Sequence, residues 1–433
     1  MNEQTRLFIR DNAEKDIRTL ALSGKRYPEV DMPFALDQIA GRQTARKKLP
    51  TWAEHDDIIY PPHLSMEQCS SEQTARYKMH LSSLCPLPSS FVDLTGGFGV
   101  DFSYMSQGFQ KAVYVERQEH LCDIARNNFR VLGLENAEVV HGDGVEYLNS
   151  LSHVSVIYLD PARRNEHGGK TYAINDCTPD VTEIRHLLIE KSDKVIVKLS
   201  PMLDWRKAVG DLDNCVSEVH IVSVDNECKE LLLVMERNVV NLKVVCVNNN
   251  EVFSYVQGGQ EFKSFSPSLN NASGVQTLAS DARQIPQAES NNSSTRQLVN
   301  LSTERTNSST FLYEPNASIM KAGCFDLLED RYGVRQLERN SHLFVSESLI
   351  EDFPGRKFKI EAVTSLNKKD IKKTLSGIDK ANISVRNFPM SVDELRKRLK
   401  IKEGGSDYIF ATTLADKSHV LLLCRRKAAS QQN

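Results

Sequence analysis

The stretch Asp93-Leu94-Thr95-Gly96-Gly97-Phe98-Gly99 ends a β-rich run and opens a helical pattern. Glycines permit a tight turn and let a ligand approach the backbone, and the start of the following helix offers free N–H groups. The dinucleotide pattern G-x-G-x-x-G fails because Phe102 stands at the place of its third glycine. A Walker A loop is also excluded, since no Gly-Lys-Ser/Thr follows. We therefore expect a ligand-binding turn of another kind.

Strand and helix patterns alternate around this turn. Short β-rich runs end at Leu94, Val115, Val140, Leu159 and Leu199, and helical patterns cover Gln118–Leu132 and Asp180–Lys191. This alternation predicts an α/β fold with a parallel sheet and helices on both of its faces. The runs Ser217–Val224 and Glu230–Arg237 are separated by a short polar turn, which predicts an antiparallel hairpin. We expect the sheet to end with that hairpin.

Other parts of the chain have different patterns. Residues 1–66 read as a helical region, 67–245 as the α/β domain, 246–310 as a connecting segment and 311–433 as a small α+β module. A further helix is expected over Ser71–Ser82, at the start of the α/β domain. Residues 266–310 contain ten Ser, five Thr, six Asn and four Gln and no aromatic residue. Such a segment buries too little apolar surface to offset its ordering entropy, so it is predicted to be flexible.

The composition excludes several classes of protein. The 433 residues carry a formal net charge of -3, which is unlike a polycation that binds nucleic acid along its whole length. No apolar run approaches the roughly 18 residues of a membrane span, and no signal peptide is apparent, so we expect a cytoplasmic protein without a membrane partner. The nine cysteines form no C-x-x-C pair and none lies near a histidine at zinc-ligand spacing, so no metal site is expected.

Two acids follow the next strands of the predicted sheet. Glu116 lies twenty residues after Gly96 at the end of the second β run, where a carboxylate can accept hydrogen bonds from both hydroxyls of a ribose. Asp143 follows the third run, where an acid can meet the exocyclic amine of an adenine. Either residue alone is typical of a helix cap or a surface turn. Their succession along one doubly wound unit predicts a nucleoside site.

With these residues in place, 67–237 resembles the class I S-adenosylmethionine-dependent methyltransferases, whose fold is a Rossmann-like seven-stranded sheet. Asp93, Gly97 and Gly99 match the family's D/E-x-G-x-G-x-G motif, although Thr95 replaces the first glycine. The closing hairpin also matches. The resemblance implies S-adenosyl-L-methionine as cofactor and implies cofactor-binding roles for Thr74, Asp93, Thr95, Gly96, Gly97, Phe98, Gly99, Asp101, Glu116, Asp143 and Gly144.

The segment Ile124–Asn128 with Gly133-Leu134 resembles the helix after the ribose acid in RNA base methyltransferases, and Ser71–Ala75 resembles the pre-sheet helix of the guanine-N2 group. The reaction site is expected at the end of the fourth strand, in Asp160-Pro161-Ala162-Arg163-Arg164. We expect catalytic roles for Asp160, Pro161, Arg163 and Lys198. Arg163 and Arg164 are expected to hold phosphates of the substrate.

Other chemistries remain open. Asp-Pro-Ala-Arg also resembles the 5-methyluridine RNA methyltransferases, but Val197–Pro201 lacks the cysteine that those enzymes use. Lys78, Asp160, Lys198 and Glu230 resemble the Lys-Asp-Lys-Glu set of RNA ribose 2'-O-methyltransferases, in which a lysine kept near neutrality takes the hydroxyl proton. A catalytically inactive RNA-binding protein, and a methyltransferase that acts on DNA, protein or a small molecule, are further alternatives.

The C-terminal module is locally basic. Residues 354–402 hold fourteen Lys/Arg against five Asp/Glu, an excess of nine positive charges. Leu312–Asn316 leads into a helix expected over Ala317–Leu328. Together with Val385–Pro389, Leu395–Leu399 and Gly404-Gly405, this pattern resembles a THUMP-like module, which a small ferredoxin-like piece precedes in some proteins. The charge and the resemblance predict RNA, as tRNA or rRNA, as the partner. Lys397 and Arg398 are candidate substrate-binding residues.

Overall fold

The computed structural model describes residues 1–82, 89–163, 173–213, 215–257 and 310–427. It divides the chain into two compact units. The first holds Met1–Val224, Cys228–Val245 and the described residues of Ser254–Lys263, and the second holds the C-terminal residues together with the short pieces Asp225–Glu227 and Cys246–Phe253. The expected flexible segment 266–310 lies almost wholly outside the described residues. No helix in the described ranges has the length and apolar character that crossing a membrane requires.

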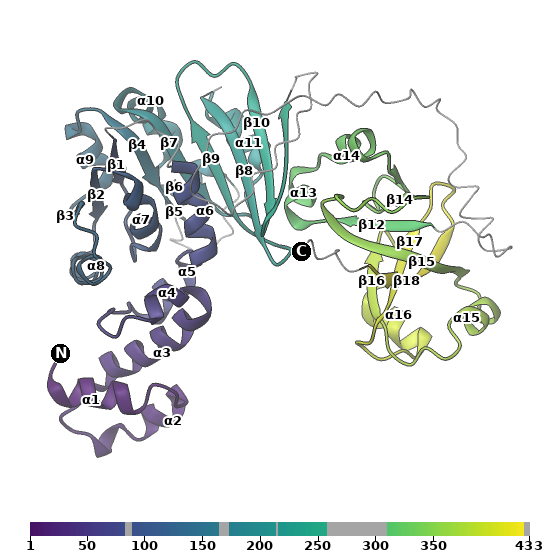
Figure 1. Ribbon diagram of the computed structural model, residues 1–433, viewed down its shortest axis with the longest axis horizontal. Helices are drawn as coiled ribbons and strands as arrows, with labels where there is room; N and C mark the ends of the chain where they lie inside the picture. Colours follow the sequence, from purple (N-terminus) through teal and green to yellow (C-terminus); the bar gives the residue numbers. More distant parts are fainter. Residues whose placement is uncertain (83–88, 164–172, 214, 258–309, 428–433) are drawn as a thin grey trace. The chain divides into compact units, whose positions relative to one another are not determined.

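The first unit begins with helices, as the sequence predicts (Figure 1). They are α1 (Glu3–Asp11), α2 (Ile17–Leu22), α3 (Met32–Lys48), α4 (Pro50–Ala53), α5 (His63–Gln68) and α6 (Glu72–Ser82), with a short 3-10 turn, η1 (Gly24–Arg26). Side-chain caps define several starts: Asp31 accepts from the backbone N–H of Phe34 at the start of α3. Trp52 and Tyr60 are buried in a cluster that also contains Phe98 of the glycine turn. The helical region therefore packs directly against the glycine turn.

A nine-stranded sheet follows, in the order β11-β10-β8-β9-β7-β4-β1-β2-β3. Its strands are β1 (Ser90–Asp93), β2 (Lys111–Glu116), β3 (Ala137–His141), β4 (Val154–Leu159), β7 (Ser192–Leu199), β8 (Val216–Val224), β9 (Glu227–Met235), β10 (Leu242–Asn248) and β11 (Glu251–Gln257). The five strands β1, β2, β3, β4 and β7 pair in parallel, and β9 pairs antiparallel with β7. The predicted α/β class with a mostly parallel sheet is confirmed.

The expectation that the sheet ends with the β8–β9 hairpin is wrong. The seven strands from β8 to β3 form the expected sheet, and β10 and β11 extend it at the β8 edge. The run Val244–Val247 is fully buried, because it is a short apolar segment with β-branched side chains that fits the pleated surface. The boundary expected after residue 245 divides this run, since a short apolar run after a completed fold gives no sign of its pairing partner.

Helices cover both faces of the parallel strands (Figure 1). They are α7 (Val100–Met105), α8 (Glu119–Val131), α9 (Gly144–Ser150), α10 (Val181–Lys191) and α11 (Trp205–Asp211), with the 3-10 turns η2 (Ser106–Gly108) and η3 (Ile174–Asp176). Phe102 of α7 and Phe129 of α8 pack in one cluster with Phe91 and Tyr158 of the sheet. A two-stranded piece, β5 (Ala162–Arg163) with β6 (Cys177–Thr178), follows β4.

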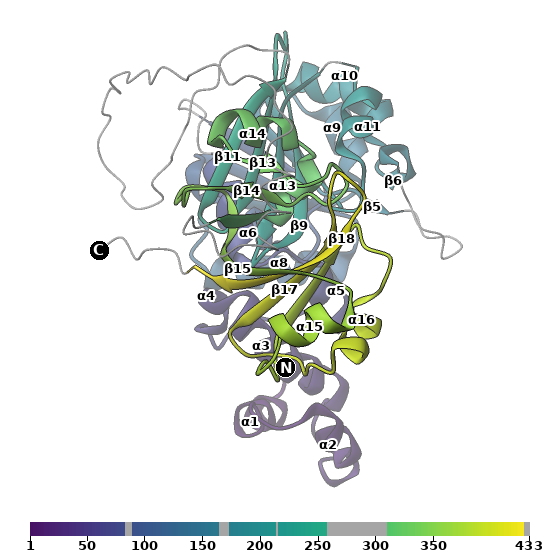
Figure 2. The same ribbon diagram turned by 90° about the vertical axis from the view of Figure 1, so that its right-hand side faces the viewer.

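The second unit is a seven-stranded sheet in the order β13-β14-β12-β15-β18-β17-β16. Its elements are β12 (Phe311–Pro315), α13 (Ala317–Ala322), α14 (Phe325–Tyr332), β13 (Arg335–Gln336), β14 (Phe344–Ser346), β15 (Gly355–Ser365), α15 (Lys368–Thr374), β16 (Asn382–Arg386), α16 (Val392–Leu399), β17 (Asp407–Thr413) and β18 (His419–Arg426). Helices α15 and α16 lie beside β17 in both views (Figures 1 and 2). The expected α+β class is confirmed, but the single helix expected over Ala317–Leu328 is two helices, because Gly323 has a left-handed φ of 65°.

Candidate functional site

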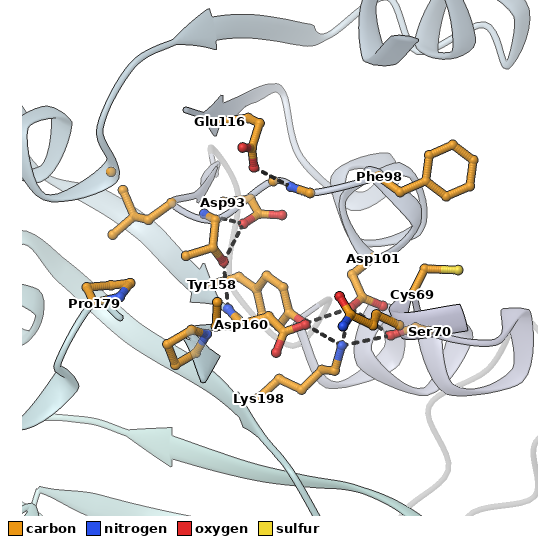
Figure 3. Close-up of a pocket in the computed structure, with 18 of the residues that line it drawn as sticks. Cys69, Ser70, Asp93, Phe98, Asp101, Glu116, Tyr158, Asp160, Pro179 and Lys198 are labelled. Carbon is orange, nitrogen blue, oxygen red and sulfur yellow. Dashed lines mark hydrogen bonds and ion pairs between the residues drawn. The ribbon is translucent and has the colours of Figure 1, made fainter. Parts of the chain in front are cut away.

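A cavity of about 790 Å³ lies at the carboxyl ends of β1, β2, β4 and β7 (Figure 3). Parallel strands bring their carboxyl ends to one edge, which is where ligands of α/β sheets bind. The cavity is lined by most of the residues that the sequence singles out, namely Asp93, Thr95, Gly96, Gly97, Phe98, Gly99, Asp101, Glu116, Asp143, Gly144, Asp160, Pro161 and Lys198. The residues predicted to bind the nucleoside and those predicted to form the reaction site therefore line the same cavity.

Glycine is required in the turn after β1 for two different reasons. Gly97 and Gly99 have φ values of 56° and 84°, which side-chain-bearing residues rarely adopt. A Cβ at Gly96 would lie 2.2 Å from the ring of Tyr114, so that position is closed by packing. A Cβ at Gly97 would meet only the Thr95 carbonyl oxygen, at 3.7 Å, so the backbone there is open to a ligand.

The two acids that were predicted to bind a nucleoside, Glu116 and Asp143, also hold the backbone of the site. Glu116 accepts hydrogen bonds from the backbone N–H of Gly97, at 2.8 Å, and of Gln118, at 2.9 Å. Asp143 accepts from the N–H groups at the start of α9 and pairs with Arg117. These N–H bonds and the Arg117 charge outweigh burial and lower the pKa of Asp143. Both acids thus lie on the cavity wall with their oxygens already oriented.

Asp93 and Thr95 connect the glycine turn to the reaction end. Asp93 is 1 % exposed and accepts a hydrogen bond from the backbone N–H of Thr95 at 2.9 Å. Burial raises the pKa of Asp93 well above its usual value, although that hydrogen bond opposes the shift. The Thr95 hydroxyl accepts from the backbone N–H of Asp160 at 2.6 Å. Thr95 stands where the D/E-x-G-x-G-x-G motif has its first glycine. Its hydroxyl therefore makes a hydrogen bond that a glycine could not make.

Asp160 lies at the tip of β4 and is paired with Lys198 of β7 (Figure 3). The Asp160 side chain is 39 % exposed, whereas Lys198 is 12 % exposed. Burial would lower the pKa of Lys198, but the charges of Asp160, Asp101 and Glu230 outweigh it and raise the pKa. Lys198 therefore stays protonated, and Asp160 has one carboxylate face toward the cavity.

Behind this pair lies a buried polar network centred on Asp101. Its carboxylate accepts from the hydroxyls of Ser70, at 2.8 Å, and Tyr158, at 2.7 Å, and pairs with Lys78 at 3.1 Å. Lys78 is fully buried and also pairs with Glu230. Burial alone would raise the pKa of Asp101, but Lys78 and Lys198 lower it to about 2. The network ties α6, α7, β4 and β9 together beneath the cavity.

Some expected residues lie elsewhere. Thr74 is 2 % exposed and does not line the cavity; its hydroxyl and backbone bond to Ser71 at the start of α6. Phe98 lines the cavity, but its ring points away from the acids of the site (Figure 3) and packs edge-on against Trp52, at 5.1 Å between centroids. Lys397 and Arg398 are exposed on α16 of the second unit. Residue 164 and the side chain of residue 163, two expected phosphate-binding arginines, lie outside the described residues.

The cavity also contains residues that the sequence did not single out. Cys69, Ser70 and Tyr158 are among these lining residues (Figure 3). Pro179, directly after β6, and Pro201, in the loop after β7, also line the cavity. None of these residues belongs to a motif, so a sequence signal for them was lacking. Among the described residues, no group of three or more His, Cys, Asp or Glu side chains is placed to hold a metal ion.

The comparisons with known proteins agree with this geometry. A crystal structure named "putative methyltransferase from Porphyromonas gingivalis W83" is 30 % identical to this chain, covers 98 % of both chains and has a TM-score of 0.75. The chain belongs to this methyltransferase family. The family described as "THUMP domain-like" matches residues 355–426, and a "ferredoxin-like domain" matches residues 311–354. The expected methyltransferase with a THUMP-like C-terminal module is thereby confirmed.

More distant structures cover only part of the chain. An rRNA methylase from Streptococcus thermophilus is 15 % identical over 38 % of this chain and 94 % of its own, with a TM-score of 0.28. A methyltransferase structure from Streptococcus mutans "in complex with SAH" is 15 % identical over 38 % of this chain and 96 % of its own, with a TM-score of 0.29. Their similarity is too low to support a conclusion about this methyltransferase. No curated protein matches the chain.

Proposed function

We propose that this chain is an S-adenosyl-L-methionine-dependent methyltransferase that methylates a nitrogen of an RNA base, in tRNA or rRNA. The observation that carries the proposal is the single cavity in which Gly97, Glu116 and Asp143 lie together with Asp160. Gly97, Glu116 and Asp143 would contact the nucleoside of the cofactor. Asp160 would contact the nucleophile, which is the target nitrogen. The membership of a methyltransferase family supports the reaction class.

The residues present fit the cofactor. The open backbone at Gly97, the carboxylate of Glu116 and the start of α9 at Asp143 would hold its nucleoside, and Ser70 and Asp101 line the part of the cavity between the glycine turn and Lys198. When bound, S-adenosylmethionine supplies a methyl group on a positively charged sulfur. A cavity of about 790 Å³ is in the range of small-molecule sites.

Asp160 and Lys198 are the proposed catalytic pair. The carboxylate of Asp160 is available to accept an N–H of the target amine, which orients the nitrogen and localises its lone pair. Partial burial raises the pKa of Asp160, and the charge of Lys198 opposes that shift. A carboxylate in this environment can also take the proton that the methylated nitrogen releases, at its exposed oxygen. Because methyl transfer is an in-line displacement, we expect this positioning of the nucleophile to provide most of the rate enhancement.

Pro161, at the start of the segment after β4, is buried and would stiffen the backbone next to Asp160. The expected roles of Arg163 and Arg164 in holding the substrate's phosphates stay proposals, as do those of Lys397 and Arg398 on the basic second unit. The excess of nine positive charges in residues 354–402 supports a nucleic acid over a small metabolite as substrate.

The ribose 2'-O alternative has one observation in its favour, since Lys78, Asp160, Lys198 and Glu230 join one network through Asp101. Two observations weigh against it. Lys78 is fully buried and does not line the cavity, and the pKa of Lys198 is raised rather than lowered. Neither lysine is thus suited to take a proton from a ribose hydroxyl.

Calorimetric titration with S-adenosylmethionine tests the cofactor, and mass spectrometry of nucleosides from cells with and without the gene tests the substrate. We expect heat of binding and one methylated base that disappears in the deletion strain. If the titration gives no heat, the alternative of a catalytically inactive RNA-binding protein is favoured. If the nucleoside that disappears in the deletion strain is 2'-O-methylated, the ribose chemistry is favoured. Asp160→Asn should bind the cofactor with unchanged affinity and lose most of the methyl transfer, about 100-fold or more.

A further inference from the structure

A buried carboxylate in the second unit holds two arginine side chains at once. Glu314 lies in β12 and is 2 % exposed. The Nε of Arg356, at the start of β15, donates to one carboxylate oxygen at 2.6 Å, and a terminal nitrogen of Arg386, at the end of β16, donates to the other at 2.7 Å. Three strands that are distant in the sequence therefore meet at one carboxylate.

The two arginines carry more charge than Glu314 neutralises. Their side chains are 32 % and 38 % exposed, and Glu314 is the one acid that pairs with either of them within the described residues. Two guanidinium groups and one carboxylate leave a net charge of about +1 at this point. Because the guanidinium group is a planar fork, binding one edge to a carboxylate leaves the other edge with free donors in a defined orientation.

A purely structural role explains this arrangement less well. A single arginine would compensate the buried charge of Glu314, whereas a second one adds a positive charge that must stay solvated. The surrounding backbone is also constrained: Asn387, next to Arg386, has a φ of 49°, and His342 has a φ of 52°. Left-handed residues other than glycine are uncommon and tend to gather at functional sites.

The neighbourhood of Arg386 is otherwise poor in free acids. Glu338 is engaged by the Asn387 amide, at 2.7 Å, and by Lys417, at 3.9 Å. The ring of His342 stacks on Phe325 with 4.1 Å between centroids. Burial and the charge of Arg386 lower the pKa of His342, and the charge of Glu338 opposes this shift. The two guanidinium groups that share the single carboxylate of Glu314 are therefore what favours an anion site here.

We propose that Arg356 and Arg386, held in place by Glu314, bind a phosphodiester group of the RNA substrate. This inference deepens the proposed function and rests on it. Paired arginine forks match the geometry of phosphate oxygens, and phosphate contacts fix the register of a nucleic acid on a protein without reading its sequence. The site would hold the RNA backbone on the second unit while the target base is methylated in the first.

The test measures binding of a short fluorescein-labelled RNA of mixed sequence to the full chain by anisotropy, between about 50 and 200 mM salt. Arg386→Gln and Arg356→Gln should each weaken binding about tenfold and lower the slope of log K against log salt by about 1. The matched control is Arg335→Gln, which removes the same charge from an exposed site on β13 of the same unit. It should change the affinity less than about twofold.

Glu314→Gln distinguishes a built site from general charge. The substitution makes the chain more positive, so attraction by overall charge predicts tighter RNA binding. The proposed site predicts weaker binding, about fivefold or more, because both guanidinium groups lose the oxygens that orient them. Arg386→Lys, which keeps the charge and removes the fork, should also weaken binding. Thermal unfolding of each variant identifies any that fails to fold, and Arg386→Lys then carries the test.

Three results would overturn the proposal: equal losses in Arg386→Gln and Arg335→Gln, tighter binding by Glu314→Gln, or competition by inorganic phosphate that is lost in Arg386→Gln while RNA binding is kept. The last result would indicate a site for free phosphate. A calorimetric titration with S-adenosylmethionine on the same samples separates this inference from the proposed function. Failure of the natural chain to bind S-adenosylmethionine would refute the proposed function. Cofactor and RNA binding by the natural chain, with RNA affinity unchanged in Arg386→Gln and Arg356→Gln, would refute this site alone.

Discussion

The hydroxyl of Thr95 accepts a hydrogen bond of 2.6 Å from the backbone N–H of Asp160. The backbone N–H of Thr95 in turn donates to Asp93. One side chain thereby joins the turn that would hold the cofactor to the residue that would hold the target nitrogen. The D/E-x-G-x-G-x-G motif that this turn resembles has a glycine at this position, and a glycine could not make this hydrogen bond.

We predict that Thr95→Val lowers the methyl-transfer rate about tenfold, because the backbone N–H of Asp160 loses a partner worth roughly 1–3 kcal/mol. The KM for S-adenosylmethionine should change little. Thr95→Ser keeps the hydroxyl and should restore most of the rate. Incorporation of labelled methyl groups into RNA from the deletion strain measures both variants. If the valine and serine variants behave alike, Thr95 has no positioning role.

A second prediction concerns Glu116, which accepts the backbone N–H groups of Gly97 and Gln118. Glu116→Gln should weaken cofactor binding about 10- to 100-fold, since hydrogen bonds to a charged acceptor contribute roughly 1.5–3 kcal/mol. Glu119→Gln is the matched control, because Glu119 is exposed three residues further along the chain. Calorimetric titration of both variants gives the two affinities. An unchanged affinity in Glu116→Gln would remove the acid from the cofactor site.

A third prediction separates structure from catalysis at Lys78. This ammonium group is fully buried between Asp101 and Glu230. Lys78→Met should lower the free energy of unfolding by about 3–5 kcal/mol, because it leaves buried carboxylates without their partner. Adding Glu230→Gln should recover part of this loss. Urea unfolding measures the effect. A Lys78→Met protein of normal stability that has lost ribose methylation would instead support the 2'-O chemistry.

The fourth prediction is a pH dependence at His220. The histidine is buried, its Nδ1 lies 2.6 Å from the Tyr77 hydroxyl, and its Nε2 lies 2.8 Å from Glu218. Burial lowers the pKa of His220, and Glu218 offsets only part of the shift. The folded chain therefore binds this proton less tightly than the unfolded chain, so the stability from neutral His220 is full above about pH 6.5 and is lost as the pH falls below that value.

We accordingly expect the free energy of unfolding of the natural chain to fall between about pH 7 and pH 5, and to fall less in His220→Gln. Urea midpoints at several pH values measure the two slopes. Parallel slopes would mean that His220 keeps its ordinary pKa in the folded state.

Much of the fold could be predicted because it is encoded locally. Runs such as Val154–Leu159 are apolar and β-branched over the length of one strand, and the helix caps at Asp143 and Asp180 are visible in the chain. Strands β10 and β11 were not predicted as part of the sheet, because pairing at an edge depends on which strand is left open. The break at Gly323 was overlooked because an apolar pattern continues across it.

The sequence by itself determined the order of strands and helices, the glycine turn from Asp93 to Gly99 and the acids that follow the next strands, because spacing along the chain sets where a parallel sheet ends each strand. Only the tertiary structure decided what surrounds them. Ser70, Asp101 and Lys198 meet beneath Asp160, and Arg356 and Arg386 meet at Glu314, through packing between elements that are distant in the chain. These contacts depend on how the faces of helices and sheets pack against one another. A local sequence pattern does not contain that information.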